Sequence, residues 1–347
     1  MRIAQIAPLI ESVPPKRYGG TERVVFNLTE ELIRLGHEVV LFASGDSATS
    51  AELVPCCDRG LRMDGRVRDF HAYTTIQLAM VYERAHEFDV IHNHADYFAF
   101  PFARLTRTPT VTTMHGRLDL SEVRRVNDFF QEQPLISISQ AQRRHLPRAN
   151  WVATVYNGIA VEQFTLRMQP GRYLAFLGRV ALEKRLDRAI EVARAVGMPL
   201  RVAAKIDPAD REYYEHAIRP LLDHDLVEFV GEIDEQAKDD FLGRAYAYLF
   251  PIDWPEPFGI TMIEAMATGT PVIAMECGSV PEVVVNGVTG FICKDVGEMI
   301  RAVRRIPEIS RQACRDHVAR HFSRAVMASR YLQAYQRVLT APESVPA

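Results

Sequence analysis

Short apolar runs alternate with amphipathic stretches through the first half of the chain. Residues 2–7 form an apolar run of strand length, and residues 22–35 follow with apolar side chains at helical spacing, up to Gly36. Four more strand-like runs lie at residues 38–43, 89–94, 110–115 and 135–139. Strands that alternate with helices in this way predict a doubly wound parallel sheet.

The second half repeats this alternation after a stretch rich in turn residues. Asn157-Gly158 and Pro170-Gly171 punctuate that stretch, so we place a domain junction there. The elements predicted beyond it are strand 173–178, helix 183–196 closed by Gly197, strand 199–204, helix 210–222 and strand 227–231. The fold class is therefore α/β, with Rossmann-like domains at residues 1–165 and 166–322. The 347 residues of the chain agree with two domains of roughly 150 residues each.

The composition is that of an ordinary globular protein. Hydrophobic residues make up 48% of the chain and charged residues 24%, and the formal net charge is −3. No nucleic acid partner is expected, because the chain lacks a basic excess. Arginines at 124–125 and 143–144, with Arg148, could meet anionic lipid or an anionic acceptor, but solvated helix faces explain such pairs more often. Peripheral membrane contact and the oligomeric state stay open.

Cysteine usage and the N-terminus indicate a cytoplasmic location. Five cysteines without a Cys-x-x-Cys pair argue against a disulfide framework and against a zinc ribbon. The apolar N-terminus lacks the length and the cleavage site of a secretory signal. No apolar stretch approaches the ~18 residues that a membrane-spanning helix needs.

Two glutamates, Glu256 and Glu264, bracket a glycine-bearing loop that runs into a predicted helix. The helix is expected to begin near Gly259 or Ile260, where its unpaired N–H groups and its dipole would favour phosphate oxygens. A carboxylate one turn further along would suit ribose hydroxyls. On spacing alone, a solvated loop glutamate and a helix-capping charge explain the pair better.

The context of the pair favours a ligand site. A helix that ends at Gly269 precedes a short apolar strand, which puts the glutamates at a β-to-α crevice of an open sheet. Together with the run at residues 278–291, this region resembles the retaining glycosyltransferases of family 4, whose signature is two glutamates separated by seven residues. The resemblance implies the GT-B fold, in which two Rossmann-like domains face a central cleft.

The resemblance also implies roles for the signature residues. In that family the first glutamate faces the hydroxyls of the donor sugar and the second holds the ribose of the nucleotide, which assigns these roles to Glu256 and Glu264. The further donor-binding or nucleotide-binding residues that it implies are Gly178, Gly231, Phe258, Gly259, Ile260 and Thr261.

A basic pair follows the first strand of the second domain. Arg179 and Lys184 match the cations that neutralise the donor diphosphate in that family. Such cations stabilise the charge that develops on oxygen as the bond from the anomeric carbon to diphosphate breaks. Lys184 is one of only five lysines beside 36 arginines. Taken alone, Arg179 and Lys184 would more often be solvated cations at the start of a helix. The glutamate pair of the same domain favours the ligand-binding interpretation instead.

The residues Tyr18-Gly19-Gly20-Thr21-Glu22 are similar to the glycine-rich first turn of that family, where the backbone approaches phosphate and acceptor. We expect Gly20 on the donor side, and Gly19 and Glu22 on the acceptor side. A plain tight turn explains the glycines equally well. The loop is not a G-x-G-x-x-G fingerprint, which removes the main support for a nicotinamide dehydrogenase.

Histidines stand at the ends of two predicted strands. His115 matches the histidine that hydrogen-bonds an outer hydroxyl of the donor sugar in that family, and we assign it this role. His92, His94 and Asp96 could be read as metal ligands. We favour structural or acceptor-side histidines instead, with His94 as the acceptor-side candidate and no metal, because the family works without a metal site.

Three segments complete or depart from the family pattern. The segment 323–347 resembles the helix that crosses back to the first domain. Residues 203–207 stand where many relatives carry a glycine-rich turn, and Lys205 is a candidate replacement for its phosphate contacts. Ala160 stands where relatives often have Asp.

The resemblance implies a retaining, metal-independent transferase of carbohydrate biosynthesis. It would move a hexose from a UDP- or GDP-sugar to a small-molecule, glycan or lipid-linked acceptor, with the nucleotide sugar as co-substrate and no cofactor. A nucleotide-sugar-binding protein, or an epimerase on the same fold, is the alternative.

Overall fold

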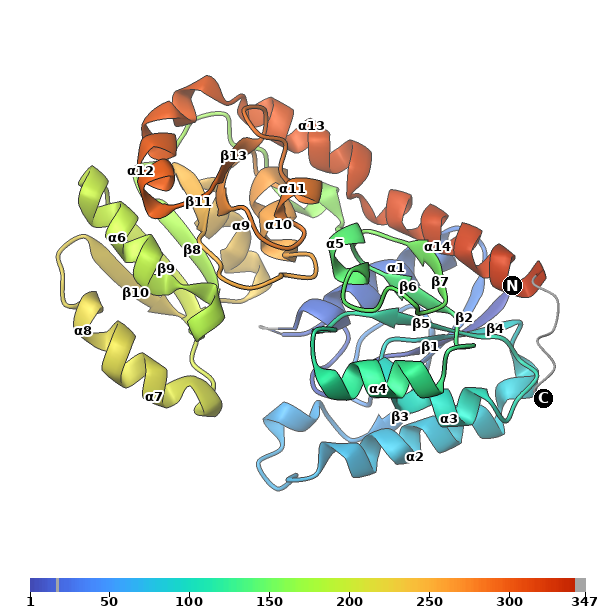
Figure 1. Cartoon of the computed structure of the whole chain (residues 1–347). Coiled ribbons are helices and arrows are strands. Elements are labelled where there is room, and N and C mark those ends of the chain that lie inside the picture. The colour runs from blue at the N-terminus through green and yellow to red at the C-terminus, as the bar shows by residue number, and fades with distance from the viewer. Residues whose placement is uncertain (17–18, 341–347) are drawn as a thin grey trace. The chain divides into compact units, whose positions relative to one another are not determined.

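The computed structural model describes residues 1–16 and 19–340, and it divides into two compact units. Unit 1 holds Met1–Gly158 and the segment that begins at Arg324, and unit 2 holds Ile159–Ser323 (Figure 1). The expected junction at 165/166 therefore differs from the division at 158/159. Tyr18 and residues 341–347, which carry predictions, lie outside the described residues.

The division falls directly after the turn Asn157-Gly158, within the stretch where we placed the junction, and the residues that follow it already pack on unit 2. Ile159 forms a β-bridge with Ser323. The backbone N–H of Thr165 donates to a carboxylate oxygen of Asp239 at 2.7 Å. A turn signal marks a bend in the chain, whereas the junction depends on these long-range contacts.

Seven parallel strands form the sheet of unit 1. Their bounds are β1 Arg2–Ile6, β2 Glu38–Ser44, β3 Glu52–Cys57, β4 Val90–Asn93, β5 Thr110–Met114, β6 Leu135–Ser137 and β7 Trp151–Thr154, and their order is β3-β2-β1-β4-β5-β6-β7. The edge strands β3 and β7 were not predicted from the sequence. Both are only partly buried, and β3 contains Pro55, which an edge strand tolerates.

Helices cover both faces of this sheet, as a doubly wound fold requires. They are α1 Gly20–Arg34, α2 Phe70–Glu83, α3 Phe100–Ala103, α4 Ser121–Phe129, α5 Gln140–Arg143 and α14 Arg324–Thr340. In Figure 1, α2, α3 and α4 lie on the opposite side of the sheet from α1 and α14. Val40 and Phe42 of β2 pack with α2, whereas Leu41 and Ala43 pack with α1. Successive strand residues point to opposite faces, so the strand is apolar over residues 39–43, between Glu38 and Ser44.

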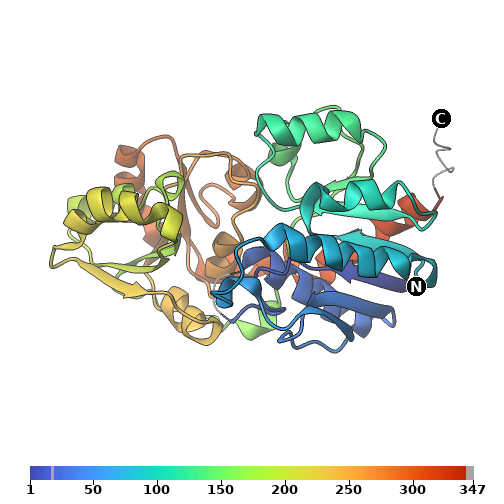
Figure 2. The same ribbon diagram turned by 90° about the horizontal axis from the view of Figure 1, so that it is seen from below.

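Six parallel strands form the sheet of unit 2. Their bounds are β8 Leu174–Arg179, β9 Leu200–Lys205, β10 Val227–Gly231, β11 Ala247–Phe250, β12 Val272–Met275 and β13 Gly290–Cys293, and their order is β10-β9-β8-β11-β12-β13. The helices are α6 Leu186–Val196, α7 Arg211–Tyr213, α8 Arg219–Leu222, α9 Glu235–Gly243, α10 Ile260–Ala267, α11 Val280–Val283, α12 Val296–Arg305 and α13 Arg311–His321. Figure 2 shows the sheet of each unit with its helices from a second side. Two parallel-sheet α/β domains are confirmed.

Two predicted helices of unit 2 differ from the structure. Helix 183–196 begins only at Leu186, because Arg185 takes a left-handed conformation (φ 53°) after a 3₁₀ turn. Helix 210–222 is broken by a π-helical turn over residues 214–218. Pro220, two residues further on, has no N–H for the α-helical ladder.

Candidate active site

The site in unit 2 lies where the strand order of its sheet reverses. β8 and β11 are neighbours there, although β9 and β10 come between them in sequence. Ligands of open parallel sheets bind at the carboxyl ends of the strands that flank such a reversal. Arg179 is the last residue of β8, Lys184 lies in the turn that follows it, and the loop after β11 carries Glu256. The topology therefore brings together residues that are far apart in sequence.

Lys184 and Glu256 form a direct ion pair in this crevice. The ammonium group of Lys184 donates to Oε2 of Glu256, and the same oxygen accepts from Nε1 of Trp254 at 3.0 Å. The ammonium also lies over the Trp254 ring, 4.8 Å from its centroid. Glu256 is only 9% exposed, so this charge pair is weakly screened by solvent. Sequence reasoning missed Trp254, which stands two positions before Glu256 in the loop.

A turn of the following segment holds the backbone of Glu256 in place. The N–H of Ser279 donates to the carbonyl of Glu256 at 3.0 Å, and the Ser279 hydroxyl donates to the carbonyl of Phe258 at 2.8 Å. Gly278 has φ 56°, and a Cβ there would come within 2.4 Å of the Glu256 backbone. Only glycine fits this close approach.

The helix after the loop begins as predicted, at Ile260. Gly259 is its N-cap, with φ 75° and no side-chain cap, so the first-turn N–H groups of α10 are directed toward the loop. Phe258 is buried (1% exposed), which leaves its backbone as the part that can meet a ligand. Oγ1 of Thr261 hydrogen-bonds the hydroxyl of Tyr248 at 2.7 Å. This helix end can hold an anion.

Glu264 is fully buried one turn into α10. Its Oε1 accepts from Nζ of Lys238, on α9, at 2.8 Å. Lys238 also pairs with Glu235 at 2.5 Å. Sequence reasoning missed Lys238, because it stands 26 positions before Glu264 and no local motif links the two residues. The only clue in the sequence was that lysine is rare in this chain.

The two predicted cations have different partners. Arg179 Nη2 donates to Glu183 at 2.5 Å, and its Nε lies 3.2 Å from Asp210. Asp207 joins Lys205 to the surroundings of Arg179. Its Oδ1 lies 2.7 Å from Nζ of Lys205, and its Oδ2 lies 3.8 Å from Nη1 of Arg179. Burial raises the pKa of Asp210, although nearby Arg179 lowers it. Arg179 is thus surrounded by carboxylates, whereas Lys184 pairs with Glu256.

Gly178 is the last residue but one of β8, and Gly231 is the last residue of β10, on the same sheet. A Cβ on either would meet no atom within 4 Å, and Gly231 has φ 84°. Val230, next to Gly231, is exposed (39%). Both glycines therefore border open space at the carboxyl ends of their strands.

In unit 1, the reversal of strand order lies between β1 and β4. Gly19 is the N-cap of α1 and Gly20 its first residue, which places the glycine loop after β1. Glu22, in the first turn, is 5% exposed. Burial raises the pKa of Glu22 to about 7, and the charge of Glu11 adds to the rise. The carboxylate of Glu11 itself pairs with Arg62.

The histidines predicted in unit 1 form one cluster. His115 follows β5 and its Nε2 lies 2.8 Å from Nδ1 of His94, which follows β4. Nε2 of His94 lies 2.8 Å from Oε1 of Gln5. Burial lowers the pKa of His92 and His94, and lowers the pKa of His115 to about 3. All three rings are therefore neutral near pH 7.

His92 is enclosed by protein partners. Its Nδ1 lies 2.7 Å from the hydroxyl of Tyr335, and its Nε2 lies 2.7 Å from the hydroxyl of Thr113. Burial raises the pKa of Asp96 to about 6, and this residue has φ 51°. Within residues 1–16 and 19–340, no group of three or more His, Cys, Asp or Glu side chains is arranged to hold a metal ion.

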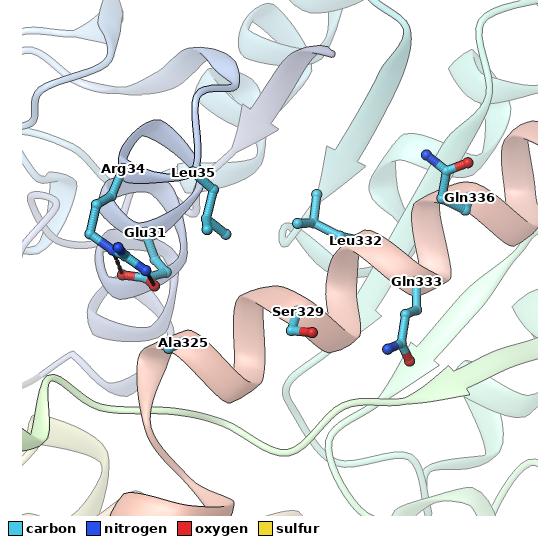
Figure 3. Close-up of a pocket in the computed structure, with 8 residues that line it drawn as sticks. All are labelled: Glu31, Arg34, Leu35, Ala325, Ser329, Leu332, Gln333 and Gln336. Atoms are coloured by element: carbon cyan, nitrogen blue, oxygen red, sulfur yellow. Dashed lines mark hydrogen bonds and ion pairs between the residues drawn. The ribbon is translucent and has the colours of Figure 1, made fainter.

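Two further features bear on surfaces. A groove of about 360 Å³ lies between α1 and α14 (Figure 3), lined by Glu31, Arg34, Leu35, Ala325, Ser329, Leu332, Gln333 and Gln336. None of the donor or acceptor candidates lines it.

Across the described part of the chain, no helix has both the length and the apolar character needed to span a membrane.

Comparisons with known proteins agree over most of the chain. The family model "Glycosyltransferase Family 4" matches residues 18–163, and the model "Glycosyl transferases group 1" matches residues 162–321. The chain is 27% identical to a glycogen synthase of Mycobacterium tuberculosis, over 84% of this chain and 83% of that protein. It is 25% identical to a phosphatidyl-myo-inositol mannosyltransferase of Mycobacterium leprae, over 99% of both.

A solved structure shares the fold. A protein of Anabaena in complex with UDP and glucose superposes with a TM-score of 0.74 at 17% identity, over 97% of this chain and 99% of that chain.

Proposed function

Because this chain belongs to the group 1, family 4 glycosyltransferases, we propose that it transfers a hexose from a nucleoside diphosphate sugar to an acceptor hydroxyl, with retention at the anomeric carbon. The fold is GT-B and the enzyme is a glycosyltransferase. The observation that carries the finer proposal is the Lys184–Glu256 ion pair at the carboxyl end of β8 and β11.

Unit 2 binds the donor in this proposal. The N–H groups at Ile260 and Thr261 hold diphosphate oxygens, because a helix start without a side-chain cap favours anions. Lys184 and Arg179 neutralise the charge that develops on the leaving diphosphate. Glu264 binds the ribose hydroxyls, as its place in the family signature implies.

Glu256 orients the donor sugar rather than attacking it. Its Oε2 accepts from both Lys184 and Trp254, and a carboxylate held by two donors is a weak nucleophile but a fixed acceptor for sugar hydroxyls. The departing phosphate then helps to deprotonate the acceptor hydroxyl, on the face from which it leaves. No metal takes part in this proposal, because Lys184, Arg179 and the α10 amides supply the positive charge.

Unit 1 binds the acceptor and the outer hydroxyls of the sugar. Gly19, Gly20 and Glu22 lie at the start of α1, and His94 and His115 directly follow the neighbouring strands β4 and β5. The names of the relatives refer to glycogen and to phosphatidyl-myo-inositol, so both a glycan and a lipid-linked acceptor stay in the proposal. The donor is a UDP- or GDP-sugar, and the UDP complex of the Anabaena structure supports the former.

The test is nucleotide release from a panel of UDP-, GDP- and ADP-hexoses, with a chelator present and with Glu256→Gln as the control. Release from one donor that falls by at least about a hundredfold in the variant supports a metal-independent transferase, because a preorganised polar group in the site contributes about that factor. Loss of release in the chelator contradicts metal independence. Epimerised donor without transfer would support the epimerase alternative, and the anomeric configuration of a transfer product decides retention.

A further inference from the structure

A chain of buried hydrogen bonds links the last helix of unit 1 to His115. From the helix inward, the hydroxyl of Tyr335 lies 2.7 Å from Nδ1 of His92 and 3.3 Å from Nε2 of Gln5. Oε1 of Gln5 lies 2.8 Å from Nε2 of His94, whose Nδ1 lies 2.8 Å from Nε2 of His115. His94 and Gln5 are 2% and 0% exposed, so water does not compete for these bonds.

The donor or acceptor character of each atom determines which partner donates in each of these hydrogen bonds. A carbonyl oxygen only accepts, so the proton of His94 lies on the Nε2 that faces Gln5 Oε1. Nδ1 of the neutral His94 ring is then an acceptor, and Nε2 of His115 must donate to it. The Gln5 amide donates to the Tyr335 hydroxyl, which leaves that hydroxyl to donate to His92.

The far end of the chain agrees with this direction. With Nδ1 accepting, His92 donates from Nε2 to Thr113 Oγ1 at 2.7 Å, and the Thr113 hydroxyl donates to Tyr331 at 3.2 Å. Each ring must be neutral for this pattern, and burial lowers the pKa of all three histidines. The reverse direction would require the Gln5 amide to be turned over, with its NH₂ against His94.

We propose that His94, Gln5 and Tyr335 are positioning residues that hold His115 in the tautomer protonated on Nε2, so that His115 presents Nδ1 to the bound sugar as a hydrogen-bond acceptor. Among residues 1–16 and 19–340, the only hydrogen bond of the His115 ring is the one to His94. The inference rests on the proposed function for the identity of the ligand, but the tautomer itself does not. His115 therefore selects a sugar hydroxyl that donates, and it gives no proton to the substrate.

The first measurement is the tautomer of His115 in the ligand-free protein. Long-range ¹H–¹⁵N correlation spectra of protein labelled with ¹⁵N-histidine distinguish the two neutral forms, and His115→Gln assigns the signal. We expect the proton on Nε2. A proton on Nδ1 would overturn the proposal, and this readout needs no variant of the relay to fold.

The second measurement compares two tyrosines of the same helix. Tyr335→Phe removes the hydroxyl that fixes the Gln5 amide, whereas Tyr331→Phe removes only the last acceptor of the chain. Both side chains are 0% exposed and both variants lose one oxygen, so Tyr331→Phe is a matched control. We expect mixed tautomers of His115 in Tyr335→Phe, and a single tautomer in Tyr331→Phe. Identical spectra of His115 in the wild type and Tyr335→Phe would contradict the relay.

Nucleotide release adds a functional readout. We expect kcat/KM for the donor to fall about three- to tenfold in Tyr335→Phe, the size of one weakened hydrogen bond, and to stay near the wild-type value in Tyr331→Phe. Equal losses in both variants would indicate a merely structural role. If the wild type releases nucleotide from no donor while the tautomer is as expected, the proposed function fails and the relay stands.

Discussion

The ammonium group of Lys184 is hydrogen-bonded to the carboxylate of Glu256, although 72 positions separate the two residues in sequence. The side chains are 18% and 11% exposed. The crevice is poorly hydrated, so each charge is stabilised mainly by the other. Removal of one side chain leaves the opposite charge of the other side chain uncompensated. The pair couples the loop after β8 to the loop after β11.

Loss of either member of this pair should abolish transfer while the fold persists. We expect Glu256→Ala and Lys184→Ala each to lower nucleotide release at least about a hundredfold, because preorganised charge at the reacting bond is lost. Lys294→Ala, which removes an exposed lysine of the same unit, is the control and should keep wild-type activity. Full activity in Glu256→Ala or Lys184→Ala, with an unchanged circular dichroism spectrum, would contradict the assignment of this site.

Gly278 should be required for activity because of its close contact with the Glu256 backbone, and not only because of its left-handed φ. Gly278→Ala forces a Cβ against the Glu256 backbone, whereas Gly287→Ala meets no atom within 4 Å at a similarly left-handed φ of 76°. Both variants carry backbone strain of about 1 kcal/mol, but only the first displaces the glutamate. We expect nucleotide release to fall at least about tenfold in Gly278→Ala alone, since small displacements in an active site have large kinetic effects. Equal activities in the two variants would refute this role.

The Lys238–Glu264 pair allows stability and ligand binding to be separated. Lys238→Met should lower the free energy of unfolding by about 3–5 kcal/mol, because it leaves a buried carboxylate without its cation. The double variant Lys238→Met/Glu264→Met should recover most of this loss, since an apolar pair replaces both charges. Urea unfolding measures both values.

Calorimetric titration with UDP and with GDP then tests the ribose role of Glu264. The double variant should bind the nucleotide that the wild type prefers at least about tenfold more weakly, as expected for the loss of a charged hydrogen-bond acceptor. Native affinity in a stable double variant would show that Glu264 has only a structural role.

The carboxylates around Arg179 should compete with the diphosphate. Asp210→Asn keeps the shape of the side chain and removes one negative charge 3.2 Å from the guanidinium. We expect the dissociation constant for the preferred nucleoside diphosphate to fall about two- to fivefold, with a weaker effect at high salt. Asp239→Asn, which neutralises the partner of Arg167 elsewhere in unit 2, is the matched control. An unchanged or higher dissociation constant in Asp210→Asn would contradict competition.

Glu22 should make unit 1 less stable at alkaline pH. Burial raises the pKa of Glu22 from 4.5 to about 7, so between these values the folded state keeps a proton that the unfolded state has released. The free energy of unfolding therefore falls as pH rises through this window, by up to about 3 kcal/mol from this group. Glu22→Gln mimics the protonated form and should remove that loss.

The check is urea unfolding of the wild type and Glu22→Gln at pH 5 and pH 8. The variant should be the more stable protein at pH 8, with a smaller difference at pH 5. The buried histidines act in the opposite direction, because their lowered pKa values favour the folded state as pH rises, but they are common to both proteins and cancel in the comparison. A difference that does not grow with pH would show that Glu22 is ionised in the folded protein.

Much of the framework was readable from local pattern. The alternation of short strands and helices predicted two parallel-sheet domains, and the start of α10 at Ile260 followed from the glycine before it. Glu256 and Glu264 were found because their spacing lies within one loop and one helix. The edge strands β3 and β7 were missed, because Pro55 interrupts the first and both are short and only partly buried.

Sequence by itself determined the order of the elements, the glycines that permit left-handed turns and the family to which the chain belongs, since each depends on residues close together in the chain. The tertiary structure alone decided the partners of the charged and polar groups: Lys184 with Glu256, Lys238 with Glu264, Arg179 with Asp210, and His92 with Tyr335. These partners come from different strands and helices. Local periodicity fixes which face of an element is buried, but the order of strands in the sheet fixes which faces meet.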